Sequence, residues 1–188
     1  MMLGKIFSDP AALLVMAVVT VLVAVAGRWV AGNRRHFDAL RGGLDVLRKV
    51  GRELPPEHPI RRRLESAPVV EVSFEEIAHL LGAEGVGAAA LALLRLRSQL
   101  NWIERFGQLA VHLGILGTVF ALVTADFGDP EAFRTKLPIA LGTTLFGLIG
   151  AVVLSLLGGV AESVLDRATE AVRDALLSGF DDEGDVRG

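Results

Sequence analysis

Three long runs of residues without any Asp, Glu, Lys or Arg constrain this chain more than any other feature of its sequence. They cover residues 10–27, 106–125 and 137–161. A helix over residues 10–31 is roughly 33 Å long at about 1.5 Å per residue, and the hydrocarbon core of a bilayer is about 30 Å thick. The pattern therefore predicts an all-α membrane protein with three transmembrane helices, over residues 10–31, 106–126 and 138–160.

The composition agrees with a membrane protein and excludes several other classes. Hydrophobic residues make up 52% of the 188 residues, and 21 glycines come in addition. The absence of cysteine excludes disulfides, thiolate metal sites and cysteine nucleophiles. A net charge of −3 gives no reason to expect nucleic acid as a partner. No metal-ligand spacing, nucleophile motif or phosphate-binding loop occurs, so we expect neither an enzyme nor a bound cofactor or metal.

The first apolar run has two interpretations. As an uncleaved helix, it has Ser8 and Asp9 as capping residues and Pro10 in its first turn. As a signal peptide it lacks a basic n-region, because only Lys5 precedes it, and no small-residue cleavage site leads to a clear mature start. The uncleaved helix is favoured.

The distribution of Lys and Arg predicts the orientation of the spans, because cytoplasmic loops carry more of them. One such residue precedes the first span, whereas basic residues crowd the segment after it: Arg28, Arg34, Arg35, Arg41, Arg48 and Lys49. The short loop 127–137 has two, together with acidic residues. We therefore expect the N-terminus and the loop 127–137 outside, and residues 32–105 and 161–188 inside.

The expected cytoplasmic parts have helical patterns. Between residues 32 and 105, an apolar stripe ends at the proline-rich segment 55–59, and Ser73 and Glu76 form a capping box before a short helix. From about Val86 no breaker interrupts the chain, which predicts one helix reaching into the second span. The third span continues as an amphipathic helix to about residue 180, before a disordered acidic tail. The second and third spans thus extend into the cytoplasm as long helices.

Small residues form rows on the second and third spans. A row at intervals of three and four residues lets two helices approach closely, and threonine hydroxyls in it offer hydrogen bonds to a partner or an ion. Simple packing of two helices of one chain explains the same rows. The positions of interest are Gly114, Gly117, Thr118 and Ala121 in the second span and Thr143, Thr144, Gly147, Ala151 and Ser155 in the third. His112 is the only ionisable residue in the core of a span, which makes it a possible proton relay, although such a histidine is more often a packing residue.

Two strings in these spans carry a family resemblance. LGILGTVFALV begins at Leu113, and ALGTTLFGLIGAVV begins at Ala140. Together they resemble the paired signature of the MotA/TolQ/ExbB family of stator subunits of ion-driven motors. The three-span layout is similar to the TolQ/ExbB branch. Two differences stand out: Ile139 occupies a position where ExbB-like proteins often carry glutamate, and Ala121 replaces a usual glycine.

The resemblance implies a homopentamer in the bacterial inner membrane, around a dimer of a single-span ExbD/TolR/MotB-like protein. The partner supplies the aspartate that binds the ion, which fits the absence of carboxylates from these spans. By match to the motif, Thr118 and Thr144 line the ion path, with Thr143 as an added hydroxyl. The family branch favours H⁺ as the transported ion, and Na⁺ stays open. The alternative is a non-conducting membrane scaffold that uses the same faces only for assembly.

Overall fold

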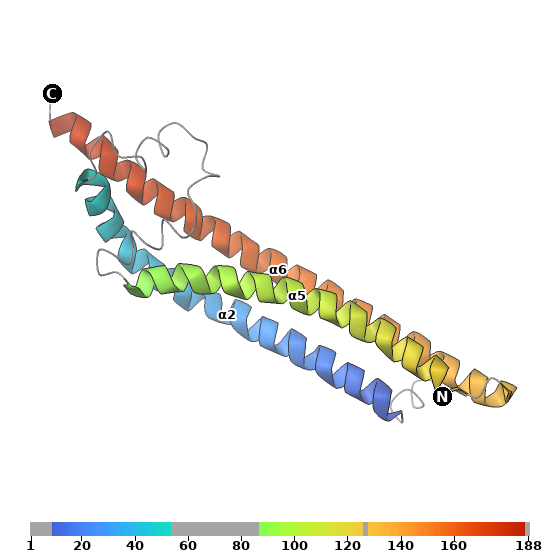
Figure 1. Cartoon of the computed structure of the whole chain (residues 1–188). Helices are drawn as coiled ribbons and strands as arrows, with labels where there is room; N and C mark the ends of the chain where they lie inside the picture. Colours follow the sequence, from blue (N-terminus) through green and yellow to red (C-terminus); the bar gives the residue numbers. More distant parts are fainter. Residues whose placement is uncertain (1–8, 54–86, 126–127, 187–188) are drawn as a thin grey trace. The chain divides into compact units, whose positions relative to one another are not determined.

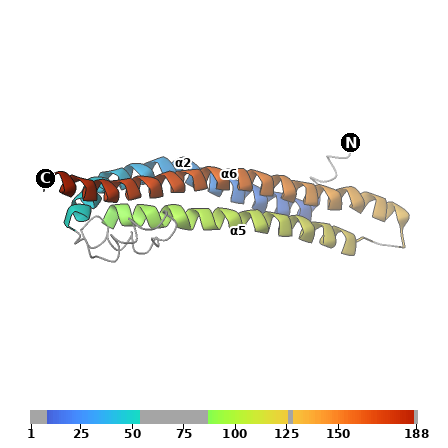
Figure 2. The same ribbon diagram turned by 90° about the horizontal axis from the view of Figure 1, so that it is seen from above.

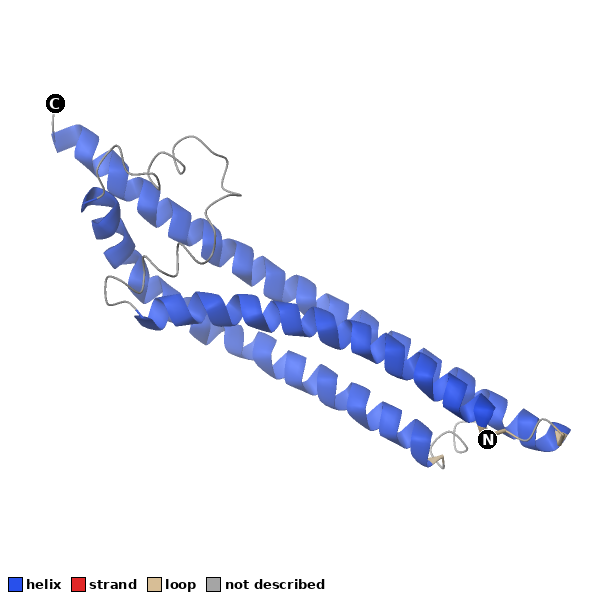
Figure 3. Cartoon of the chain, in the orientation of Figure 1, coloured by secondary structure: helices blue, strands red, loops and turns tan. Residues whose placement is uncertain are grey.

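The computed structural model describes residues 9–53, 87–125 and 128–186, and all regular structure in these ranges is helical (Figure 3). The helices are α2 (Pro10–Glu53), α5 (Gly87–Val123) and α6 (Pro130–Val186). Each contains a segment long and apolar enough to cross a membrane, namely Pro10–Asn33, Leu91–Val123 and Pro130–Val172. For the described ranges, the predicted all-α fold with three spanning helices is confirmed.

Helix α2 begins where the capping signal predicts. The Asp9 Oδ1 atom accepts hydrogen bonds from the backbone N–H groups of Ala11 at 3.0 Å and Ala12 at 3.3 Å. These bonds satisfy two of the N–H groups that a helix start leaves without intrahelical partners. Asp9 is therefore the N-cap, while Ser8 lies outside the described residues.

Helix α6 begins earlier than predicted, and this corrects the expected loop 127–137. Asp129 Oδ1 accepts a bond from the N–H of Glu131 at 2.9 Å, and Pro130 takes the first helical position. Cap and proline together start the helix eight residues before Pro138. Pro138 itself lies inside α6.

The chain divides into two compact units, and each helix contributes to both. The first unit comprises residues 1–30 and 100–160, and the second comprises residues 31–99 and 161–188. Within the first unit, the α5 and α6 segments lie side by side in both views (Figures 1 and 2). Gly107 lies near Leu154 and Gly117 near Thr143, so α5 and α6 are antiparallel there.

Helix α2 completes the first unit by packing against both other helices. Ala12 shares a buried apolar cluster with Ala121 of α5 and with Ile139 and Ala140 of α6. Further along, the ring of Trp29 stacks on Phe106 of α5, with ring centroids 5.6 Å apart. Within this unit α2 therefore runs parallel to α6 and antiparallel to α5, the order that three successive membrane crossings require.

The second unit has its own apolar core. Buried side chains recur at helical spacing along both of its long segments, at Ala92, Leu93 and Leu96 of α5 and at Ala161, Leu165, Ala168, Val172 and Ala175 of α6. The amphipathic pattern predicted after the third span is confirmed over these positions. The tail predicted to be disordered is helical to Val186, as the last part of α6. The proline-rich segment 55–59 and the short helix after Ser73 lie outside the described residues.

Candidate functional site

The backbones of α5 and α6 meet at two glycines. A Cβ atom on Gly147 would lie 2.6 Å from the carbonyl oxygen of Ala110 and 2.7 Å from the Cα atom of Gly114. A Cβ atom on Gly114 would lie 3.2 Å from the Cα atom of Gly147 and 3.2 Å from the carbonyl oxygen of Thr143. Contacts this short are tighter than those that Cβ atoms ordinarily make. A Cβ atom at Gly147 would force the backbones apart, whereas one at Gly114 would need a shift of a few tenths of an ångström, so the close approach depends most on Gly147.

A third glycine covers Thr143. A Cβ atom on Gly117 would lie 2.9 Å from the Cβ atom and 3.0 Å from the Oγ1 atom of Thr143. The side chain of Thr143 is only 1% exposed, and its hydroxyl donates to the carbonyl oxygen of Ala140 in its own helix at 2.8 Å. Within the described chain, Thr143 is thus enclosed between α5 and α6.

The residues that follow Gly117 and Thr143 in the sequence are both threonines, and their hydroxyls bond to each other across the two helices. Thr118 Oγ1 of α5 and Thr144 Oγ1 of α6 form a hydrogen bond in which either group is able to donate. Thr118 Oγ1 also lies 2.9 Å from the carbonyl oxygen of Ala140 and 3.1 Å from that of Gly114. Thr144 Oγ1 lies 3.3 Å from the carbonyl oxygen of Gly114. We call Thr118, Thr144 and these two carbonyl groups the hydroxyl cluster.

The hydroxyl cluster has two self-consistent hydrogen-bond arrangements, because each hydroxyl carries one proton. In the first, Thr118 donates to the carbonyl oxygen of Ala140 or to that of Gly114 and accepts from Thr144. In the second, Thr118 donates to Thr144, which donates to the Gly114 carbonyl oxygen. Rotation of two hydroxyl groups interconverts them without movement of either helix. Both threonines are half-buried, so an approaching group is able to reach the cluster.

The cluster contains hydrogen-bonding oxygens and no ionisable group. Its side chains and carbonyl groups belong to the apolar runs 106–125 and 137–161, which lack Asp, Glu, Lys and Arg. Across the described ranges, no three His, Cys, Asp or Glu side chains gather closely enough to hold a metal ion. The arrangement is therefore able to donate and accept hydrogen bonds, and it carries no charge of its own.

The other residues singled out in the sequence lie in different surroundings. Ala121 is buried in the apolar cluster that also contains Ala12 and Ile139. Ala151 is half-buried, and Ser155 is exposed. Ala121 of the α5 row thus packs within the chain, whereas the C-terminal part of the α6 row, at Ser155, does not. His112 is exposed and is not among the groups that bond Thr118 or Thr144.

Two features of the site were missed by sequence reasoning. A Cβ atom on Gly150 would overlap Cγ1 of Val19, so this glycine is where α2 packs on α6. Gly150 was missed because it lies outside the row on α6 in which Gly147, Ala151 and Ser155 follow one another every four residues. The carbonyl oxygens of Gly114 and Ala140 were also missed, because every residue has a carbonyl group and the sequence does not mark which ones accept extra bonds.

An ion pair joins α2 to α6 at one end of the first unit. Lys136 Nζ donates to Asp9 Oδ2 at 2.8 Å, and the two side chains are 31% and 12% exposed, respectively. The bond from Lys136 lowers the pKa of the Asp9 carboxyl, with smaller contributions in the same direction from the N–H groups of Ala12 and Ala11. Partial burial opposes this shift. Asp9 thus acts both as a helix cap and as a link between two helices.

Comparison with known proteins adds one finding to this geometry. Residues 75–174, just over half of the chain, match the model of a family described as the MotA/TolQ/ExbB proton channel family. The matched range includes all of α5 and the hydroxyl cluster. No curated protein and no solved structure matches the chain.

Proposed function

Because the chain belongs to the MotA/TolQ/ExbB proton channel family, we propose that it is the stator subunit of a two-component motor driven by proton-motive force. Its three long apolar helices and its family make it a multi-pass membrane protein. The proposal extends to the bacterial inner membrane, with the N-terminus outside and the C-terminus in the cytoplasm.

One observation carries the proposal, namely the pair of hydroxyls from Thr118 and Thr144. A neutral hydroxyl donates a hydrogen bond to a carboxylate and accepts one from a carboxylic acid. In either arrangement both hydroxyl protons bond oxygens of this chain, so the cluster accepts a bond from a passing carboxylic acid as it stands, and it donates to a carboxylate when one hydroxyl rotates away from its internal acceptor. Because the uncharged runs 10–27, 106–125 and 137–161 contain no carboxylate, we assign that acid to a partner. A single-span protein with an aspartate early in its helix meets this requirement.

The C-terminal part of the small-residue row on α6 supports assembly with further helices. Ser155 is exposed, and no atom lies within 4 Å of a Cβ placed on Gly159. A helix face that meets only lipid has no need of small residues, whereas one that packs closely against another helix does. The proposed assembly is a pentamer of this chain around two helices of the single-span partner.

In the proposed mechanism, the ion binds the partner's aspartate. Protonation removes a charge whose presence in a low-dielectric environment is costly, and the neutral side chain then moves past apolar surface. Thr118 and Thr144 receive the acid on one side of this step and release it on the other. Successive protonations at five equivalent sites then rotate the pentamer against the dimer.

A flux measurement tests this proposal. The chain and a single-span partner of the stated type are reconstituted in vesicles with a pH-sensitive dye inside, and acidification is followed after a proton gradient is imposed. We expect proton entry that Thr118→Val or Thr144→Val lowers by about tenfold or more. Thr20→Val is the matched control, since the Thr20 hydroxyl lies in a span and bonds only to Met16 of its own helix at 2.7 Å. Full flux in both cluster variants contradicts the proposed path, and flux that requires Na⁺ reassigns the ion.

The second candidate function is a non-conducting scaffold. The observation that favours it is that carbonyl groups of the same chain already accept bonds from both hydroxyls, so helix packing alone accounts for the cluster. Native mass spectrometry of the purified chain, alone and with the partner, separates the candidates in combination with the flux assay. A pentamer that binds two partner copies supports the motor. An assembly that binds no partner and conducts no ions supports the scaffold.

A further inference from the structure

Three aromatic rings form a ladder at one end of the spans in the first unit. The ring centroids of Trp102 and Phe106 on α5 are 6.0 Å apart, and Phe106 stacks on Trp29 of α2. Trp102 is 47% exposed, although its ring is among the largest in the chain. The outer end of this aromatic ladder is therefore open to whatever surrounds the helices.

A guanidinium group lies on the exposed ring. The Cζ atom of Arg105 is 5.5 Å from the ring centroid of Trp102, a cation–π contact that orients the arginine. In the described part of the chain, Arg105 bonds no carboxylate. By contrast, Arg134 pairs with Glu131, and Lys136 pairs with Asp9. The exposed Glu104 is the adjacent residue, about 100° around the helix from Arg105, and it forms no bond to it.

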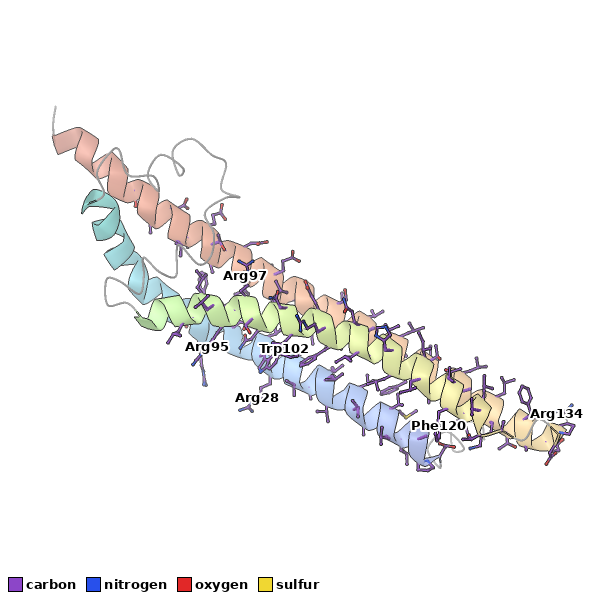
Figure 4. The ribbon with its side chains drawn as sticks, in the orientation of Figure 1. Arg28, Arg95, Arg97, Trp102, Phe120 and Arg134 are labelled. Carbon is purple, nitrogen blue, oxygen red and sulfur yellow. The ribbon has the colours of Figure 1, made fainter. Side chains whose placement is uncertain are left out.

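The sequence places the aromatic ladder at the edge of the apolar band. Arg105 directly precedes the uncharged run 106–125, and Arg28 directly follows the uncharged run 10–27. The stacking of Trp29 on Phe106 brings these two edges to the same level. Arg28 is exposed and points outward from α2, and Figure 4 shows it and Trp102 at one end of the spans, with Phe120 and Arg134 toward the other. This is the level at which lipid headgroups meet a transmembrane helix, and tryptophan prefers it.

From this placement we infer that Arg105 and Trp102 form a binding site for the headgroup of an anionic phospholipid. The guanidinium group offers N–H donors in a planar fork that matches phosphate oxygens. The face of Trp102 supports the guanidinium and contacts the first carbons of the acyl chains. A zwitterionic lipid carries its own cation, which competes with Arg105 for the phosphate, so the site prefers a lipid with net negative charge. This inference is independent of ion conduction.

The chain offers a reporter at the site itself. Trp29 and Trp102 are its two tryptophans, and it has no tyrosine. The variant Trp29→Phe keeps a ring against Phe106 and leaves Trp102 as the only strong fluorophore. Brominated phosphatidylglycerol and brominated phosphatidylcholine with identical acyl chains quench Trp102 when they occupy the site. Competition between each brominated lipid and its unbrominated counterpart in mixed vesicles gives the relative affinity of the two headgroups.

We expect phosphatidylglycerol to bind at Trp102 about fivefold more tightly than phosphatidylcholine, the ratio that one cation near a charged surface supplies. Arg105→Gln in the Trp29→Phe background brings the ratio to about one. Arg134→Gln, which removes an arginine near the other end of the spans, leaves it unchanged. Size-exclusion chromatography and helicity verify folding, and Arg105→Met, which keeps an apolar stem over Trp102, is used if Arg105→Gln does not fold.

Three outcomes overturn the inference. The first is equal affinity for the two lipids in the Trp29→Phe protein, and the second is a preference that survives removal of the Arg105 charge. The third is displacement of brominated phosphatidylglycerol by inorganic phosphate at constant ionic strength. This last result means that the site binds free phosphate and not a lipid.

Discussion

The hydroxyl of Thr118 in α5 bonds the hydroxyl of Thr144 in α6, although 26 positions separate them in the sequence. Each of these hydroxyls also reaches a backbone carbonyl oxygen of the opposite helix, that of Ala140 for Thr118 and that of Gly114 for Thr144. The two helices thus share one hydrogen-bonded cluster inside an apolar band. Such a cluster costs little when all its bonds are made and becomes unfavourable when one partner is removed.

The first prediction concerns the coupling of these two hydroxyls. Because each serves as the partner of the other, Thr118→Val combined with Thr144→Val should reduce proton flux no further than either substitution alone. Each single substitution leaves one half-buried hydroxyl with fewer partners, so we expect a loss of about tenfold or more. Thr118→Ser and Thr144→Ser keep the hydroxyls and should retain most of the flux. Additive losses in the double variant contradict the shared cluster.

The second prediction concerns the contact between Gly114 and Gly147. Gly147→Ala places a methyl group against the backbone of α5. Overpacking of this kind lowers the free energy of unfolding by about 1–3 kcal/mol. We expect a lower midpoint of thermal unfolding in detergent. Gly159→Ala is the matched control, because no atom lies within 4 Å of its added Cβ and alanine favours the helix. Equal stability of the two variants indicates that the α5–α6 contact is looser than the structure shows.

The third prediction distinguishes Thr143 from its neighbour Thr144. The Thr143 hydroxyl is buried under Gly117 and donates only to Ala140 of its own helix, so Thr143→Val replaces it with a methyl group of the same size. We expect Thr143→Val to keep assembly and most of the proton flux. A loss of flux as large as that of Thr144→Val places Thr143 in the ion path as an added hydroxyl beside Thr144.

The fourth prediction is a pH dependence at Asp9. Its pKa in the folded protein lies below the ordinary value of 3.8 because of the bond from Lys136. A carboxyl with a lowered pKa stabilises the folded state above its unfolded pKa, and this contribution is lost as the pH falls through the lowered value. Asp9→Asn keeps the capping oxygen and removes the charge. The variant should therefore be less stable than the wild type near pH 7, by up to about 1 kcal/mol for a partly exposed pair.

Thermal unfolding of both proteins between pH 7 and pH 3 checks this prediction. The difference between them should shrink only below about pH 4, where Asp9 becomes protonated. Lys136→Met should lower stability by a similar amount, and Asp9→Asn should have no further effect in that background. A constant difference across the pH range contradicts a role for the Asp9 charge.

Much of the fold follows from local sequence patterns. The uncharged runs predict the three spanning segments, and Asp9 predicts the start of α2 through its capping oxygen. Spacing alone placed Gly114 and Gly147 in rows of small residues. The start of α6 was predicted too late, because Pro130 and Pro138 are both compatible with a helix start. The structure shows that Asp129 provides the cap for the earlier one.

Local patterns were thus enough to predict which segments are helical and apolar, since these properties depend on neighbours three and four residues away. Which faces meet was visible only once the helices were packed together. The tertiary structure separated Thr144, which bonds Thr118 across the interface, from Thr143, which is enclosed beside it. It also paired Asp9 with Lys136 over a separation of 127 positions. A helix pattern specifies the rotation of side chains about one axis, whereas the register between two helices depends on how closely their backbones pack at glycine.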